Sequence, residues 1–70
     1  MDKYEITLWW SDEDEVFVAE APDLPGCMAH GETREAALAS IQEAMRLWIE
    51  VARKAGDPIP NPKGRRTLHA

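Results

Sequence analysis

The stretch from Thr33 to Ala55 constrains the fold most, because its apolar residues recur at intervals of three and four. That spacing is typical of an α-helix with one buried face. Thr33 is suited to cap the amino end, and Gly56 followed by Pro58 is a common helix stop. We therefore predict one long helix from about Thr33 to Ala55. Its apolar stripe comprises Leu38, Ile41, Met45, Trp48 and Ala52, widened by Ala37, Ala44 and Ile49.

Two segments with alternating apolar residues precede this helix. Residues 3–10 alternate around Tyr4, Ile6, Leu8 and Trp10, and residues 16–21 alternate around Phe17, Ala19 and Ala21. A polar run over 11–15 joins them, so the pattern predicts an antiparallel hairpin. After the Pro- and Gly-containing segment 22–26, residues 27–30 are short and apolar. They predict a brief third strand, with a buried loop as the alternative.

The predicted order is strand, strand, strand, helix, which is an α+β arrangement. We expect a small antiparallel sheet with one long helix packed on one of its faces. Residues 1–62 are predicted to form a single domain, and residues 63–70 a short basic tail. Within that tail, residues 65–68 either add a fourth strand at an edge of the sheet or stay disordered.

The small size of the chain favours self-association. A domain of about 60 residues buries only about 60% of the surface that its unfolded chain exposes, which leaves little stability. One cysteine permits no internal disulfide, and one cysteine with two histidines is a poor zinc set. Leu47 and Val51 lie off the main helix stripe, so we predict that they contact another copy in a dimer or tetramer. The alternative is that both are ordinary exposed apolar residues.

The charge of the chain favours a basic partner over nucleic acid. Thirteen acidic against eight Lys and Arg residues give a net charge of −5. Phosphate neutralisation carries most nucleic-acid affinity, and the basic residues of 63–66 alone supply little of it. An acidic protein is better suited to meet a basic protein through electrostatic steering. The sequence has no membrane-spanning run and no signal peptide, so we expect a cytoplasmic protein.

No arrangement of residues predicts catalysis, and no cofactor or metal is expected. The acidic run Asp12, Glu13, Asp14 and Glu15 lacks the fixed ligand offsets of a calcium loop, so a solvated turn is the preferred interpretation. Cys27 and His30 are three residues apart, which on a strand directs them to opposite faces. Cys27 is therefore interpreted as structural, and the protein is predicted not to be an enzyme.

The position of each tryptophan in the alternating or helical pattern predicts which way its side chain faces, and the three therefore have different predicted roles. Trp10 and Trp48 are predicted to meet in the core between sheet and helix. Trp9 points the other way, and tryptophan is enriched in binding hot spots, so it is predicted to contact a partner. The remaining predicted partner-binding residues lie in two loops, and they are Asp12, Glu13, Asp14 and Glu15 in the first and Asp23, Leu24, Pro25 and Gly26 in the second.

Taken together, these motifs resemble the HicB-like antitoxin family. The resemblance runs from Trp9-Trp10 through the acidic turn and the Pro-Asp-Leu-Pro-Gly-Cys stretch at 22–27 to Gly-Glu-Thr-Arg-Glu-Ala at 31–36, and it covers about Tyr4 to Pro62. It implies a partial ribonuclease-H-like fold without the nuclease carboxylates, and oligomerisation through this domain. It also implies binding and masking of a small basic HicA-type toxin that cleaves mRNA.

One departure from the family pattern bears on function. Many members carry a further DNA-binding segment, whereas only eight residues follow Pro62 here. DNA binding is therefore not expected of this short form, unless an assembly combines the basic tails. Two rival functions are a stand-alone oligomeric module, structural or ligand-binding, without a toxin partner, and a residual nuclease or hydrolase.

Overall fold

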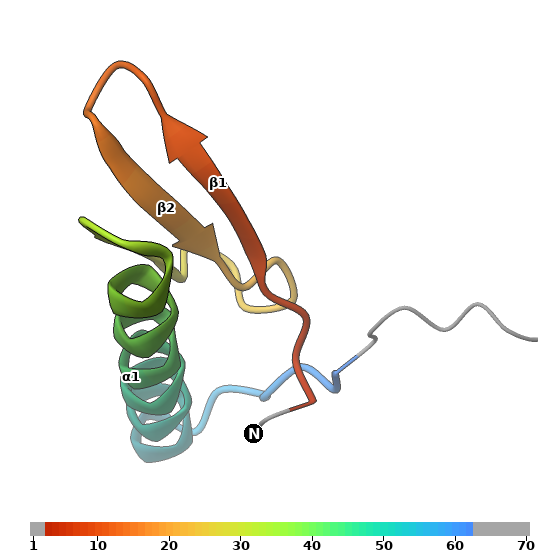
Figure 1. Ribbon diagram of the computed structural model, residues 1–70. Helices are drawn as coiled ribbons and strands as arrows, with labels where there is room; N and C mark the ends of the chain where they lie inside the picture. Colours follow the sequence, from red (N-terminus) through yellow and green to blue (C-terminus); the bar gives the residue numbers. More distant parts are fainter. Residues whose placement is uncertain (1–2, 63–70) are drawn as a thin grey trace, which may run out of the picture.

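The computed structural model describes residues 3–62 and shows a three-stranded sheet covered on one face by one helix (Figure 1). The strands are β1 (Thr7–Ser11), β2 (Val16–Glu20) and β3 (Met28–Gly31), and the helix is α1 (Arg34–Ala55). All neighbouring strands are antiparallel in the order β1-β2-β3. The predicted α+β architecture is confirmed. The predicted fourth strand and the predicted basic tail 63–70 lie outside the described residues.

The register of the sheet separates two faces. One row of paired residues contains Leu8, Ala19 and Ala29, and the next contains Trp10, Phe17 and Gly31. These rows face α1, because Ala19 is fully buried and because Leu8, Phe17 and Ala29 pack against the core cluster. Successive side chains along a strand alternate between faces. The row of Trp9, Val18 and His30 therefore lies on the opposite, outer face.

The helix has both predicted caps. The Thr33 hydroxyl accepts a hydrogen bond from the Ala36 amide at 3.0 Å, and Gly56 adopts the left-handed φ of 77°. The Gly56 and Asp57 amides then donate to the Arg53 and Ala52 carbonyls, which satisfies the last turn. The apolar stripe is shifted from the predicted one: Ala37, Ile41, Met45 and Ala52 are its buried residues. The prediction that Leu38 belongs to this stripe is wrong, because Leu38 lies beside the buried face of the helix and is 41% exposed.

The core lies between α1, the sheet and the loop before β3. Leu24 and Ile41 are its largest fully buried side chains, and Tyr4 and Cys27 are also buried. Gly31 marks the closest approach of helix and sheet. A Cβ on Gly31 would lie 2.4 Å from the Ala37 amide nitrogen, a distance that no real side chain tolerates. Only glycine lets the first turn of α1 lie this close to β3.

The prediction that Trp10 meets Trp48 in the core is wrong. The β1–β2 hairpin extends beyond the first turn of α1, so the helix does not cover the end where Trp10 lies (Figure 1). Trp10 is 46% exposed, and its indole N–H donates to Asp12 Oδ1 at 2.8 Å. Its ring packs edge-on against Phe17, whose own ring lies under the Arg34 guanidinium. Trp10 thus belongs to a small surface cluster.

The segments that flank the sheet and the helix meet each other. The predicted first strand begins at Thr7 instead of residue 3, yet Tyr4 and Ile6 still pack with the core. The Tyr4 hydroxyl donates a hydrogen bond to the carbonyl oxygen of Pro60, beyond the helix. The proline-containing segment 58–62 therefore returns along the amino-terminal segment instead of leaving the domain.

Candidate functional site

The outer face of the sheet carries an apolar groove that no element of residues 3–62 covers. We call it the outer groove. Trp9, one of the residues that line it, is 39% exposed, although burying its indole would be strongly favourable. Exposed apolar surface of this kind commonly marks a protein-binding site. The residues that line the outer groove are Trp9, Ser11, Asp14, Val16, Val18, Met28, Ala29 and His30.

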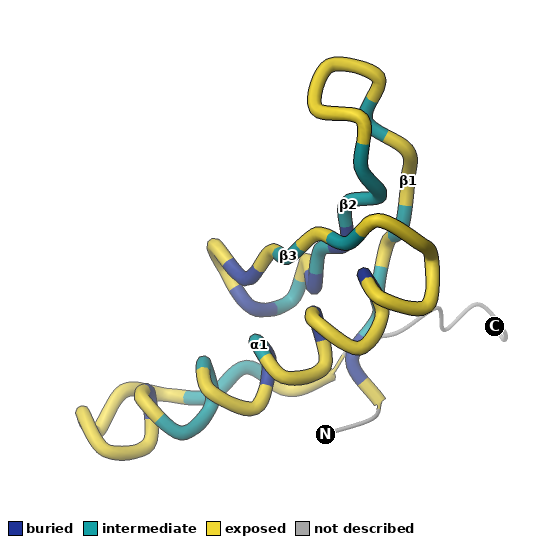
Figure 2. The backbone as a smooth tube through the Cα atoms, turned by 60° about the vertical axis from the view of Figure 1, so that its left-hand side comes forward, coloured by how far each residue is buried: buried dark blue, intermediate teal, exposed yellow. Residues whose placement is uncertain are grey.

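Four consecutive carboxylates form the tip of the hairpin at one end of the outer groove. Residues 12–15 are all exposed, and Figure 2 shows the hairpin tip standing away from the rest of the chain. The turn is tight: the Glu15 amide donates to the Ser11 carbonyl at 2.7 Å, and Glu15 adopts a φ of 57°. Asp14 also lines the outer groove. The tip therefore places negative charge at one end of the groove that Trp9 lines.

The charges of the tip are not neutralised locally. Within residues 3–62, the carboxylates of Glu13, Asp14 and Glu15 form no ion pair, while Asp12 accepts the hydrogen bond from Trp10. The same described part contains no group of three or more acidic, His or Cys side chains placed to hold a metal ion. An exposed group of uncompensated carboxylates attracts positively charged partners.

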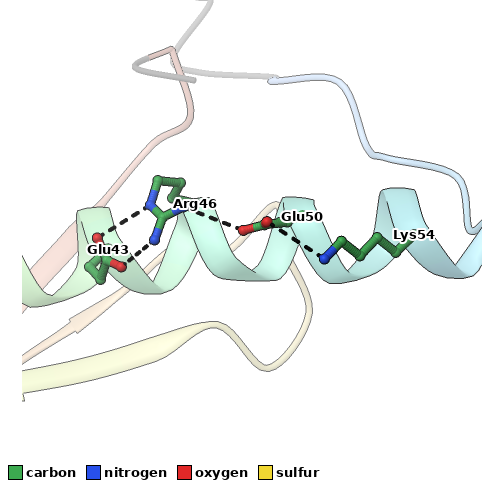
Figure 3. A network of polar contacts seen from close by, with 4 residues as sticks. All are labelled: Glu43, Arg46, Glu50 and Lys54. Carbon is green, nitrogen blue, oxygen red and sulfur yellow. Dashed lines mark hydrogen bonds and ion pairs between the residues drawn. The ribbon is translucent and has the colours of Figure 1, made fainter.

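Two acidic residues on the exposed face of α1, Glu43 and Glu50, have local partners instead. Arg46 bridges Glu43 at 2.6 Å and Glu50 at 3.3 Å, and Lys54 reaches Glu50 at 3.9 Å (Figure 3). The hydrogen bond and the charge of Arg46 lower the pKa of the Glu43 carboxyl. Such exposed pairs contribute little stability. They do compensate the charge of this stretch of the helix, whereas the four consecutive carboxylates of the tip have no such cationic partner within residues 3–62.

The second predicted partner-binding loop, Asp23 to Gly26, is partly structural. Leu24 is only 1% exposed, so its side chain anchors the loop in the core and we leave it out of the proposed contact surface. The loop is closed by hydrogen bonds from the Leu24 amide to Ala21 and from the Cys27 amide to Leu24. Pro25 and Gly26 are exposed, and the Pro25 carbonyl accepts the Trp48 indole N–H at 2.9 Å.

A second apolar groove lies between α1 and the start of β3, and we call it the helix-side groove. Leu47 and Val51, the residues predicted for self-association, are 46% and 66% exposed there. Met28 lines both this groove and the outer groove. The helix-side groove is lined by Gly26, Cys27, Met28, Ala44, Leu47, Trp48, Val51, Ala52 and Asp57.

Cys27 and His30 do not form a reactive pair. Cys27 is 4% exposed and packs in the core, and burial raises the pKa of its thiol. His30 is exposed on the outer face, opposite Val18. A cysteine nucleophile needs a lowered pKa and an adjacent base, and Cys27 has neither within the described residues.

Fold and surface thus define a small α+β module with an acidic, apolar-lined face suited to contacting another protein. Comparison with known proteins specifies the class further. The chain belongs to the HicB-like antitoxin family of bacterial toxin–antitoxin systems, whose model matches residues 4–69. Membership implies a toxin as partner and a binding role instead of a catalytic one. No helix in residues 3–62 is long and apolar enough to cross a membrane.

Three known proteins are similar to this chain in sequence. A UPF0150 protein of Thermoplasma acidophilum is 39% identical over 69 residues, covering 97% of this chain and 99% of the relative. A UPF0150 protein of Synechocystis is 42% identical over 45 residues, covering 64% of this chain and 62% of the relative. One from Archaeoglobus fulgidus is 33% identical over 46 residues, covering 66% and 67%. No solved structure matches the chain, so the ribonuclease-H-like fold implied by the resemblance stays a prediction.

Proposed function

We propose that this protein is an antitoxin that binds and masks a small, basic, HicA-type mRNA-cleaving toxin, without catalysis of its own. The observation that carries the proposal is the position of the unpaired acidic tip at one end of the outer groove that Trp9 lines. A toxin that binds RNA needs a positively charged surface. An acidic protein that covers this surface competes with RNA for it.

The two parts of this surface have different roles in binding. Carboxylates at the exposed tip steer the encounter and raise the association rate, an effect that salt screens. Trp9, with Val16 and Val18 beside it, supplies the apolar contact that slows dissociation. Pro25 and Gly26 lie in the other predicted partner-binding loop, which borders the helix-side groove. We assign the toxin to the outer groove and the tip.

A binding experiment with a cognate HicA-type toxin tests the proposal. Calorimetry measures the affinity, and cleavage of a defined mRNA by the toxin reports masking. We expect Trp9→Ala to raise the dissociation constant by about thirtyfold, since a hot-spot residue contributes about 2 kcal/mol. Toxin that keeps full activity in the presence of excess wild-type protein would overturn the antitoxin proposal for this chain.

The charge component needs a matched control. Glu13→Gln with Asp14→Asn removes two charges from the tip, and Glu43→Gln with Glu50→Gln removes two from the helix face. We expect the tip variant to bind more slowly and with a weaker salt dependence, while the helix variant retains the wild-type association rate. Equal effects of both variants would show that net charge alone matters and that the tip is not the site.

A further inference from the structure

The β1–β2 hairpin carries one exposed tryptophan on each of its two faces. Trp9 and Trp10 are adjacent in β1, so their side chains point to opposite faces of the sheet. Trp9 lines the outer groove, and Trp10 lies on the inner face, which meets α1. The helix leaves the end of the inner face open, because the hairpin extends beyond its first turn (Figure 1). A partner with a flat surface can therefore bury one of these two rings and not the other.

The inner face of the hairpin has an apolar surface of its own, which we call the inner patch. It consists of Trp10, Phe17, Arg34 and Leu38. The Trp10 and Phe17 ring centroids are 5.0 Å apart, and the Arg34 guanidinium lies 5.0 Å from the centroid of the Phe17 ring. Leu38 follows Arg34 by one turn on the same side of α1, and its side chain is exposed. The inner patch therefore continues from the hairpin onto the start of the helix.

The Trp10 ring is already ordered before any partner binds. Its indole N–H donates to Asp12 Oδ1 at 2.8 Å, and its ring packs edge-on against Phe17. An ordered side chain loses little conformational entropy on binding, and an indole whose N–H is already bonded needs only apolar contact. Trp9 differs, because its indole N–H has no hydrogen bond among residues 3–62. A partner that buries both rings has to offer an acceptor to Trp9 and an apolar surface to Trp10.

We propose that the hairpin enters a cleft of the toxin and is contacted on both faces. One wall of the cleft covers Trp9 and the outer groove, and the other wall covers Trp10 and the inner patch. The carboxylates of residues 12–15 meet basic residues at the floor of the cleft. Charge selects this occupant, because these carboxylates have no cationic partner within residues 3–62. The two-sided contact rests on the antitoxin proposal and adds the shape of the partner, which is two apolar walls above a basic floor.

Fluorine NMR on the full chain, labelled with fluorotryptophan, tests the two-sided contact without any substitution. Each of the three tryptophans gives one signal, and the shift of that signal between light and heavy water reports the exposure of the ring to solvent. We expect Trp9 and Trp10 to lose this solvent shift when a HicA-type toxin is added to saturation, while Trp48 keeps its own. A Trp10 ring that stays as exposed as in the free chain would overturn the proposal, and so would an equal loss at Trp48.

Affinity measurements on variants of the inner patch give a second test. Trp10→Ala should raise the dissociation constant of the toxin complex about tenfold, because buried aromatic residues are common hot spots. Leu38→Gln should raise it about fivefold, and this exposed position lets the variant keep its core. Leu47→Gln is the matched control, since it makes the same change at a similarly exposed position of α1 that lines the helix-side groove. Leu47→Gln should bind the toxin as the wild type does.

The possible outcomes separate the two-sided contact from the antitoxin proposal. Wild-type protein that does not bind the toxin would end both. If Trp9→Ala weakens binding while Trp10→Ala and Leu38→Gln bind like the wild type, the toxin contacts the outer face alone. The antitoxin proposal then stands and the two-sided contact falls. Equal weakening by Leu38→Gln and Leu47→Gln would also exclude the inner patch. Circular dichroism checks that each variant is folded.

Discussion

The indole N–H of Trp48 donates a hydrogen bond to the carbonyl oxygen of Pro25 at 2.9 Å. This bond joins the middle of α1 to the loop that precedes β3. The loop also inserts Leu24 into the core and turns at Gly26, which adopts a φ of 79°. The helix, the loop and the start of β3 are thereby held as one unit.

Trp48→Phe should destabilise the protein by about 1 kcal/mol, the usual net contribution of one hydrogen bond. The aromatic ring is kept, so the loss reports mainly the N–H donor. Urea denaturation followed by circular dichroism measures the change. Trp9→Phe serves as the control, because the Trp9 indole N–H has no hydrogen bond among residues 3–62 and its loss should change stability little. An equal loss in both variants would contradict the assigned role of the bond.

Gly31→Ala should be among the most destabilising single substitutions, by about 3 kcal/mol, because overpacking forces helix and strand apart. The added methyl group would lie 2.4 Å from the Ala37 amide nitrogen and 2.7 Å from the Ala36 carbonyl carbon. Gly26→Ala is the comparison: it has open space around it, and only its φ of 79° opposes a side chain. That variant should lose only about 1 kcal/mol. Equal losses would contradict the close approach at Gly31.

Glu43 should titrate below the usual range of a glutamate carboxyl, because Arg46 lowers its pKa. A lowered pKa in the folded state means that the pair stabilises the protein above the pKa of unfolded glutamate. This contribution is lost as the pH falls through the lower folded pKa. Carboxyl chemical shifts followed by NMR during a pH titration measure the effect. Arg46→Gln should return the Glu43 pKa toward its ordinary value, and an unchanged titration would exclude the pair in solution.

Cys27 should react slowly with thiol reagents in the folded protein. Its side chain is 4% exposed, and burial raises the pKa of its thiol. Because the unfolded thiol ionises first, stability should also fall as the pH rises above the ordinary thiol pKa. Labelling with a chromogenic disulfide measures the reactivity, with and without denaturant. The variant Cys27→Ala should remove the alkaline loss, and rapid labelling of native protein would contradict the burial.

The local elements could be predicted because short-range chemistry determines them. The spacing of apolar residues gives the helix, and Thr33 and Gly56 end it with side-chain and backbone hydrogen bonds that each residue type favours. The alternation of residues 16–21 likewise gives β2 and its two faces. These features involve neighbours in the sequence, so the pattern alone contains the necessary information.

What the pattern could not give is how far α1 extends along the sheet. The alternation of residues along β1 places Trp10 on the sheet face that meets α1. The helix, however, does not extend far enough along the hairpin to cover Trp10. Leu38 also has helical spacing, but the centre of the buried face passes through Ala37 and Ile41. Both errors depend on the position of one element relative to another. Gly31 was the available signal, because a glycine within a strand marks a close approach of backbones.

The individual residues of the candidate site could be predicted from the sequence, but the way the fold brings them together could not. Trp9 and the acidic run stand out from composition and phase, and the structure places Trp9 and Asp14 in one groove. Met28 and His30 have no unusual pattern, and they reach the outer groove because β3 lies beside β2. That property follows from strand order, which three short strands do not specify by themselves.

The hydrogen bond between Tyr4 and Pro60 has a consequence for how the chain can be rearranged. Because it holds the start of the described chain against the segment beyond the helix, the backbone nearly closes into a ring. A short linker between these segments would allow new termini to be opened in the exposed turn at residues 12–15. Such a permuted protein should keep the core while the two hairpin strands are no longer covalently joined.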